Sequence, residues 1–138
     1  MNLFAVASVC FAGIVSGWYI GSHCVEEVQK GKNQLYFAHL AIIIVGTYLL
    51  GRYELTPDVL LFCLLFLASF MWSPAALFLG GVALVWVADI QLLGSILFVY
   101  AFIAGVQRYD WKLVKLVAAH ASVFAGLIVS MLVEKFLF

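Results

Sequence analysis

The chain has 138 residues, of which 67% are hydrophobic and 10% are charged, and its seven basic residues balance its seven acidic ones. An ordinary soluble domain is about half apolar and about a quarter charged, so this chain has too little polar surface to cover a soluble globule. The balanced charge, without a basic tail or a charge run, argues against nucleic-acid binding. We therefore expect one all-α domain over residues 1–138, with the lipid bilayer as its solvent.

Residues 59–106 form a long apolar stretch whose interruptions decide how often the chain crosses the bilayer. A crossing helix needs about 20 apolar residues. The step Ser73-Pro74 is typical of a helix start, because a serine oxygen caps free amides and proline fits the first helical position. Thr56-Pro57 repeats this pattern, and Asp89 is placed to cap the next helix. We therefore expect three helices here, and the alternative is two long helices with Asp89 inside one of them.

Together with the apolar runs nearer the two ends, this gives a polytopic integral membrane protein. It is expected to be a compact bundle of six short transmembrane helices, or of five under the alternative. The expected helices are residues 3–21, 35–50, 57–72, 74–88, 90–106 and 113–133. Residues 22–34 are the longest polar segment, and we expect them to form a loop.

The basic residues are unevenly divided between the two sides of such a bundle. One side has Lys30, Lys32, Arg108, Lys112 and Lys115, and the other has Arg52 and Lys135. Because short loops rich in lysine and arginine stay in the cytoplasm, we expect segments 22–34 and 107–112 to be cytoplasmic and both termini to be extracytoplasmic. Trp18, Trp72 and Trp111 fall on the basic side, where interfacial indole rings are common.

Two stripes of small residues predict close helix packing. Four-residue spacing relates Gly13, Gly17 and Gly21 in the first helix, and Ala118, Ser122, Gly126 and Ser130 in the last. Small side chains let two helix backbones approach closely in a membrane. We expect these faces to bind helices of a homo-oligomer or of a partner membrane subunit. Leu127, beside the second stripe, is expected to face lipid.

Few polar side chains interrupt the predicted helices. The intramembrane candidates are His39, Thr47, Asp58, Asp89, His120 and Ser122. His39 and His120 lie on helices that start from the same side of the membrane. Two neutral imidazoles at comparable depth are suited to axial ligation of a haem iron or to a proton relay. The alternative is that each makes a hydrogen bond inside the bundle.

Asp58 and Asp89 form a second polar pair, because the third predicted helix begins near one and the fourth ends near the other. Two carboxylates on one side of a bundle can share a proton as an aspartyl dyad. Arg52, Pro57-Asp58 and the run Asp89-Ile90-Gln91-Leu92-Leu93 resemble the two motifs of prepilin-type intramembrane peptidases, which implies aspartyl hydrolysis. However, Leu50 stands where that family has its first catalytic aspartate, and Trp86-Val87-Ala88 replaces the glycine-rich approach to the second. Helix capping is the alternative explanation.

The basic side also offers a candidate lipid-headgroup site. Arg108, Lys112 and Lys115 are close in sequence, and the two lysines share a helical face, which suits an anionic lipid headgroup. The three cysteines, Cys10, Cys24 and Cys63, lack metal-ligand spacing and are expected to be packing residues. We predict no metal site.

The sequence lacks common catalytic signatures, among them the nucleophile elbow and the Walker loop, and therefore favours a protein without enzyme activity. The leading hypothesis is a transport or channel protomer, or an accessory subunit of a membrane complex, that assembles through its small-residue stripes. A first alternative is a haem- or quinone-linked electron-transfer subunit that uses His39 and His120. A second is an intramembrane aspartyl hydrolase that uses Asp58 and Asp89.

Overall fold

The computed structural model describes residues 3–51, 78, 79, 82 and 90–137, and over these residues the chain is helical and contains no strand. The helices are α1 (Leu3–His23), α2 (Val25–Lys30), α3 (Lys32–Gly51), α6 (Ile90–Gln107) and α7 (Leu113–Leu137). The predicted all-α class is confirmed. The helices expected at residues 57–72 and 74–88 lie outside the described residues except for residues 78, 79 and 82. Asp58 and Asp89 also lie outside them.

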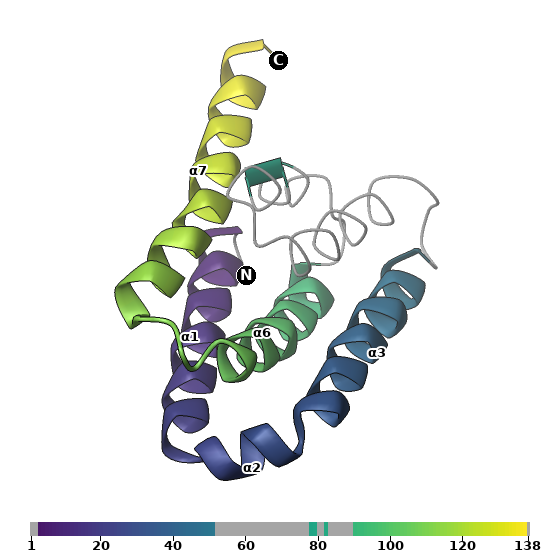
Figure 1. The fold of residues 1–138 in the computed structure, drawn as a ribbon. Coiled ribbons are helices and arrows are strands. Elements are labelled where there is room, and N and C mark those ends of the chain that lie inside the picture. Colours follow the sequence, from purple (N-terminus) through teal and green to yellow (C-terminus); the bar gives the residue numbers. More distant parts are fainter. Residues whose placement is uncertain (1–2, 52–77, 80–81, 83–89, 138) are drawn as a thin grey trace.

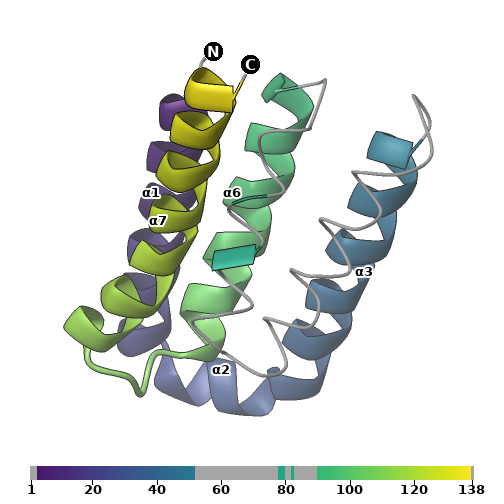
Figure 2. The ribbon, with the colours of Figure 1, turned by 90° about the horizontal axis from the view of Figure 1, so that it is seen from above.

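Three of the long helices, α1, α6 and α3, lie side by side in that order, and α7 packs against α1 (Figures 1 and 2). Helices α1 and α6 run in one direction, and α3 and α7 run in the other (Figure 1). One end of the bundle is formed by α2 with its flanking residues and by the turn between α6 and α7. We call this the basal end, made of residues 22–34 and 107–112. The start of α1 and the end of α7 lie at the opposite end (Figure 2).

The backbones of α1 and α6 are in direct contact along the glycine stripe of α1. In order along the chain, Gly13 faces the carbonyl oxygen of Phe98, Gly17 that of Phe102 and Gly21 that of Val106. Equal four-residue steps on both helices mean that they run parallel and stay in register. A Cβ atom at Gly17 would overlap the backbone of Phe102, and one at Gly105 of α6 would overlap the carbonyl oxygen of Ile14. The expected close approach therefore occurs here within one chain, between α1 and α6.

The core is organised around α6, whose buried side chains face α1 on one side and α3 on the other. Helix α7 contributes Leu116, His120, Val123 and Leu127, which recur at steps of four, three and four residues and so share one helical face. Leu127 is 0% exposed. The expectation that Leu127 faces lipid is therefore wrong, because it lies on the same face as Leu116 and His120.

The small-residue stripe of α7 does not follow one face of the helix. Each four-residue step advances about 40° beyond a full turn of an α-helix, so the stripe winds around the helix axis. Ala118 is exposed, whereas Gly126 is buried against the carbonyl oxygen of Phe78. Ser122 and Ser130 are half-buried. Only part of this stripe is therefore open to a partner.

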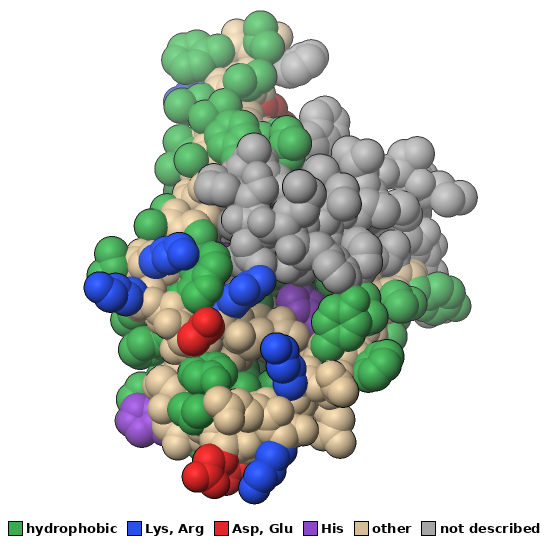
Figure 3. All heavy atoms as spheres, in the orientation of Figure 1, with side chains coloured by type: hydrophobic (Ala, Val, Ile, Leu, Met, Phe, Trp, Pro, Cys, Tyr) green, Lys and Arg blue, Asp and Glu red, His purple; other side chains and the backbone are tan. Residues whose placement is uncertain are grey.

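Large apolar side chains are exposed along the flanks of the bundle. Tyr48 of α3 is 74% exposed, and Phe136 of α7 is 81% exposed. Charged side chains gather instead around the basal end, at the bottom of the view in Figure 3. The segments Phe4–His23 and Leu113–Leu137 are long and apolar enough to cross a bilayer, and Gln91–Gln107 is a shorter apolar helix. Among the described residues, two helices thus meet the requirements of length and composition for a membrane span.

The polar segment between the first two long helices contains α2, where we expected a loop. Glu26 and Glu27 lie in its first turn and Lys30 in its last, which is the charge order that a helix dipole favours. The amide of Gly31 donates a hydrogen bond to the carbonyl oxygen of Glu27 and closes the helix (2.8 Å). Cys24, expected to be a packing residue, is exposed at the start of this segment.

Replacing Gly17 by alanine should lower the free energy of unfolding by about 1–3 kcal/mol, the usual cost of overpacking. Alanine favours a helix over glycine by up to about 1 kcal/mol, so a net loss would come from the clash with Phe102. Unfolding can be followed by circular dichroism in mixed detergent micelles. Ala12→Val, on the exposed side of α1, is the control and should have little effect. Equal stability of Gly17→Ala and the native protein would contradict the close packing.

Candidate functional site

A cavity of about 500 Å³ lies at the basal end, between α3 and the end of α6. Its apolar lining consists of Val28, Leu35, Leu40 and Ile43. Its polar and aromatic lining consists of Gln29, Lys32, Tyr36, His39, Gln107, Arg108, Tyr109 and Asp110. Several of these residues are exposed, so the cavity reaches the surface. Its volume is in the range of pockets that hold small molecules.

His39 lies at the inner end of the polar lining and is 5% exposed. Its Nδ1 donates a hydrogen bond to Oε1 of Gln107 (2.8 Å), and its ring meets the ring of Tyr100 edge-on at a centroid distance of 4.8 Å. Both partners belong to α6. The pair therefore joins the first half of α3 to the last half of α6, as expected for antiparallel neighbours.

A second contact joins the two segments of the basal end. Gln29 of α2 donates a hydrogen bond from Nε2 to the hydroxyl group of Tyr109 (3.3 Å). Gly21, at the end of α1, lies against Cβ of the same tyrosine. Segments 22–34 and 107–112 are thus in contact at one end of the bundle, which is a requirement of the predicted topology.

The turn that carries Arg108 is held in place by tryptophans. Trp18 of α1 donates a hydrogen bond from Nε1 to the carbonyl oxygen of Trp111 (2.8 Å). Above the ring of Trp111 lie the guanidinium carbon of Arg108, at 5.1 Å from the ring centroid, and Nζ of Lys115, at 4.2 Å. Cations bind the face of an indole ring favourably. Two positive charges therefore gather over one ring at the basal end.

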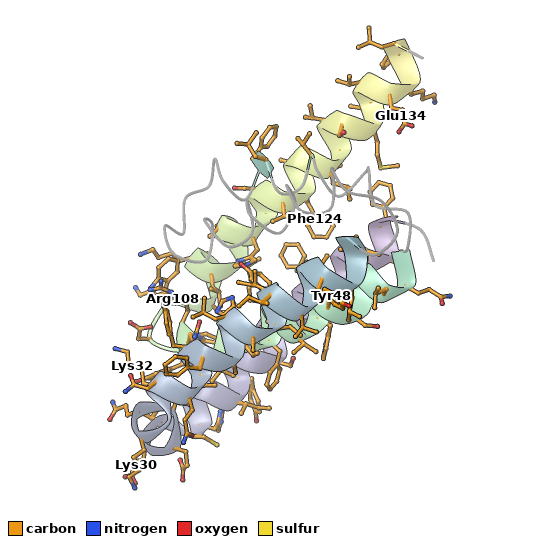
Figure 4. All side chains as sticks on the ribbon, turned by 90° about the vertical axis from the view of Figure 1, so that its right-hand side faces the viewer. Lys30, Lys32, Tyr48, Arg108, Phe124 and Glu134 are labelled. Carbon is orange, nitrogen blue, oxygen red and sulfur yellow. The ribbon has the colours of Figure 1, made fainter. Side chains whose placement is uncertain are left out.

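Arg108 lies partly buried beside the acidic residue Asp110. Burial lowers the pKa of Arg108 from its usual value, and the negative charge of Asp110 acts in the opposite direction. An arginine stays protonated at neutral pH under such a shift. Arg108 therefore brings a permanent positive charge to the cavity. Figure 4 shows Arg108 and Lys32 near each other at the basal end, with Glu134 at the far end of α7.

The two histidines that the sequence singled out belong to different parts of the bundle. His39 contacts α6, whereas His120 lies on α7, the helix that packs against α1. His120 is 3% exposed, and its Nδ1 donates a hydrogen bond to the carbonyl oxygen of Leu116 in its own helix (3.0 Å). Ligation of a haem by this pair stays a prediction. Within the described residues, no group of three or more His, Cys, Asp or Glu side chains is placed to hold a metal ion.

The remaining candidates are distributed as follows. Arg108 lines the cavity, Lys115 lies over Trp111, and Lys112 is exposed outside the cavity. Thr47 belongs to α3, but its side chain is outside the described part of the structure. Arg108 and Lys115 thus share the ring of Trp111, and of the three lipid-headgroup candidates only Arg108 lines the cavity.

Sequence reasoning overlooked the polar residues that complete the cavity. Lys32 entered only the count of basic residues, Gln107 was expected to begin the loop at residues 107–112, and Tyr100 was not considered. One signal was present: Gln107 is a polar residue at the end of an otherwise apolar helix, and it follows Tyr100 by seven residues, so both lie on one helical face. Their partner on α3 was not visible, because it depends on how the helices are arranged.

The chemistry of this cavity is that of binding. Lys32 and Arg108 suit an anion, the amide and imidazole groups provide hydrogen bonds, and the leucine and isoleucine wall suits an apolar group. Comparison of the chain with protein-family models, with curated proteins and with solved structures found no match.

Replacing Gln107 by leucine should lower the free energy of unfolding by about 1–3 kcal/mol, because the buried Nδ1 of His39 would lose this acceptor. Gln29→Leu removes a longer bond on the exposed surface and should cost less than about 0.5 kcal/mol. Unfolding of both variants by circular dichroism provides the comparison. A double-mutant cycle with His39→Phe isolates the pair, and a coupling energy near zero would contradict the interaction.

Proposed function

We propose that this chain is a six-helix membrane protein that acts as a transport protomer or as an accessory subunit of a membrane complex, and that its ligand site is the basal cavity. The observation that carries the proposal is the position of this cavity. It combines two cations with the pair of buried His39 and half-buried Gln107, at one end of a bundle whose flanks are apolar and exposed. Such an arrangement suits a site at the boundary between lipid and water.

The distribution of side chains supports insertion into a bilayer. Exposed apolar patches of this extent on a protein surface mark contacts with lipid or with other proteins. Because the helices rise about 1.5 Å per residue, α1 and α3 are each about 30 Å long, close to the thickness of a hydrocarbon core. The basic residues of the basal end then lie where the positive-inside rule places them, at the cytoplasmic surface.

The directions of the helices favour six crossings over five. Helix α3 leads away from the basal end, and α6 leads back toward it (Figures 1 and 2). The chain between Gly51 and Ile90 therefore starts and finishes at the same end of the bundle. A segment with this property crosses a membrane an even number of times or not at all. Two crossings give a total of six, whereas the alternative with five needs an odd number.

A partner is part of the proposal, because the glycine stripe of α1 is already covered by α6. The exposed side of α7 has Ala118, Ala121 and Ala125, which leave room for the backbone of another helix. A chain of this length forms a complete transport path more readily together with a second copy or a partner subunit. We therefore assign assembly to the exposed face of α7.

Cysteine labelling in intact cells tests the topology. In a background of Cys10→Ala, Cys24→Ser and Cys63→Ala, cysteines at Lys30 and Lys112 should react with a membrane-impermeant maleimide only after permeabilisation. A cysteine at Lys135 should react without it. Native Cys24, which is exposed at the basal end, provides an internal check in the unmodified chain. Labelling of positions 30 and 112 from different sides of the membrane would refute the proposed topology.

Substitution of the exposed alanines tests the assembly face. Ala121→Leu and Ala125→Leu should reduce the mass of the particle in mild detergent, because a bulky side chain keeps another backbone from approaching. Light scattering coupled to gel filtration measures that mass. Ala12→Leu, on the exposed side of α1, is the matched control. If Ala121→Leu and Ala125→Leu keep the native mass, as the control should, α7 does not provide the interface.

A further inference from the structure

We infer that the basal cavity binds an anionic amphiphile, with a phosphate or carboxylate group held by Lys32 and Arg108 and an apolar tail lying along α3. This inference rests on the proposed function for the membrane location of the cavity. It goes further by assigning the chemical class of the ligand and the orientation in which the ligand binds.

The charge of the lining favours an anion. Lys32 comes from the start of α3 and Arg108 from the end of α6, so two elements that are distant in sequence bring their cations to one cavity. Asp110 also lines the cavity and opposes part of this charge. Two cations and one carboxylate leave an excess of one positive charge, because His39 is neutral when its Nδ1 alone carries the proton. An arginine with a fixed position suits an anionic oxygen particularly well, and contact with Trp111 limits the positions of Arg108.

The polarity of the lining changes in one direction along α3. Lys32, Tyr36, His39 and Ile43 recur at three- and four-residue spacing and all line the cavity, so they form one helical face. Leu35 and Leu40 border this face. The twelve residues from Lys32 to Ile43 cover about 16 Å at the rise of an α-helix. A ligand in this cavity meets a cation at one end and branched aliphatic side chains at the other, as an amphiphile does in a membrane surface.

The location of the cavity agrees with such a ligand. In the proposed topology, the basal end lies at the cytoplasmic surface, where anionic headgroups are concentrated. An acidic phospholipid has its phosphate at the depth of Lys32 and Arg108 and its acyl chains toward the membrane interior. Its first methylene groups would then contact the aliphatic wall, while the rest of the chain extends into the bilayer.

Native mass spectrometry of the delipidated full chain in a non-ionic detergent tests this inference. Phosphatidylglycerol is the anionic probe, phosphatidylcholine the zwitterionic one and glycerol phosphate the headgroup without a tail. We expect phosphatidylglycerol to bind at least about five-fold more tightly than either of the others, in line with about 1 kcal/mol per basic residue near an anionic lipid. Lys32→Gln and Arg108→Gln should each weaken its binding by about five-fold.

Matched variants separate the cavity from the general charge of the basal end. Lys112→Gln removes the same charge from the same end but outside the cavity, and it should leave binding of phosphatidylglycerol unchanged. Lys32→Arg keeps the charge and should retain binding. Leu40→Trp fills the apolar wall and should weaken binding of the lipid without changing that of glycerol phosphate. Circular dichroism and gel filtration check that each variant keeps its fold.

Three outcomes would overturn the inference. Equal binding of phosphatidylcholine would remove the preference for an anion, and equal binding of glycerol phosphate would remove the role of the apolar wall. An equal loss in Lys112→Gln would assign the effect to the net charge of the basal end. Binding in detergent does not depend on orientation in the cell. If the topology experiment fails and selective lipid binding is intact, only the proposed membrane topology is refuted. If the labelling agrees with the topology and lipid binding is not selective, only this inference is refuted.

Discussion

Backbone contact between α1 and α6 is the constraint on which the arrangement of the bundle depends. Glycine on both helices lets carbonyl oxygens and Cα atoms meet where any side chain would intervene. The hydrophobic effect does not drive helices together within lipid. A bundle in a membrane is therefore stabilised by such close contacts and by interhelical hydrogen bonds. The parallel register that follows determines where α6 ends, and α6 in turn gives α3 its partner side chains, Tyr100 and Gln107.

The basal cavity is a consequence of that register. Helix α6 ends one residue beyond Val106, which Gly21 contacts, so Gln107 and Arg108 emerge beside the start of α3. The bond from Trp18 to the carbonyl group of Trp111 then holds the following turn against α1. Cations, amides and an imidazole are thereby brought to the polar end of an apolar bundle. Each has a hydrogen-bonding or cation–π contact, or is exposed to water, so the site avoids the cost of burying unpaired charge.

The sequence predicts the coarse architecture because composition and apolar run length act locally. Four of the expected helices coincide within a few residues with α1, α3, α6 and α7, and the two basic segments lie at one end as expected. The glycine stripe was visible, but its partner was not, since nothing local distinguishes α6 from the helix of another subunit. The error about Leu127 also came from reasoning along one helix alone. Leu127 was placed on the wrong face because the small-residue stripe was taken as straight, whereas a four-residue repeat winds around the helix.

The cavity was the least predictable feature. His39 was identified from its polarity, but its pairing with Gln107 depends on the relative position of α3 and α6, and Lys32 is one lysine among several. The helix α2 was missed because its six residues are too few for a periodic pattern. Short polar helices are better indicated by the order of their charges, as Glu26, Glu27 and Lys30 illustrate.

The parallel pairing of α1 and α6 also has a consequence for biogenesis. The ribosome makes α1 first, and α6 follows only after several tens of residues have been synthesised. Until then, the glycine face of α1 lacks the helix that covers it in the folded chain. Contacts between segments so distant in sequence form late. A nascent chain that stops before α6 therefore keeps this face uncovered, and in the proposed membrane location it would be a target for the quality-control proteases of the membrane.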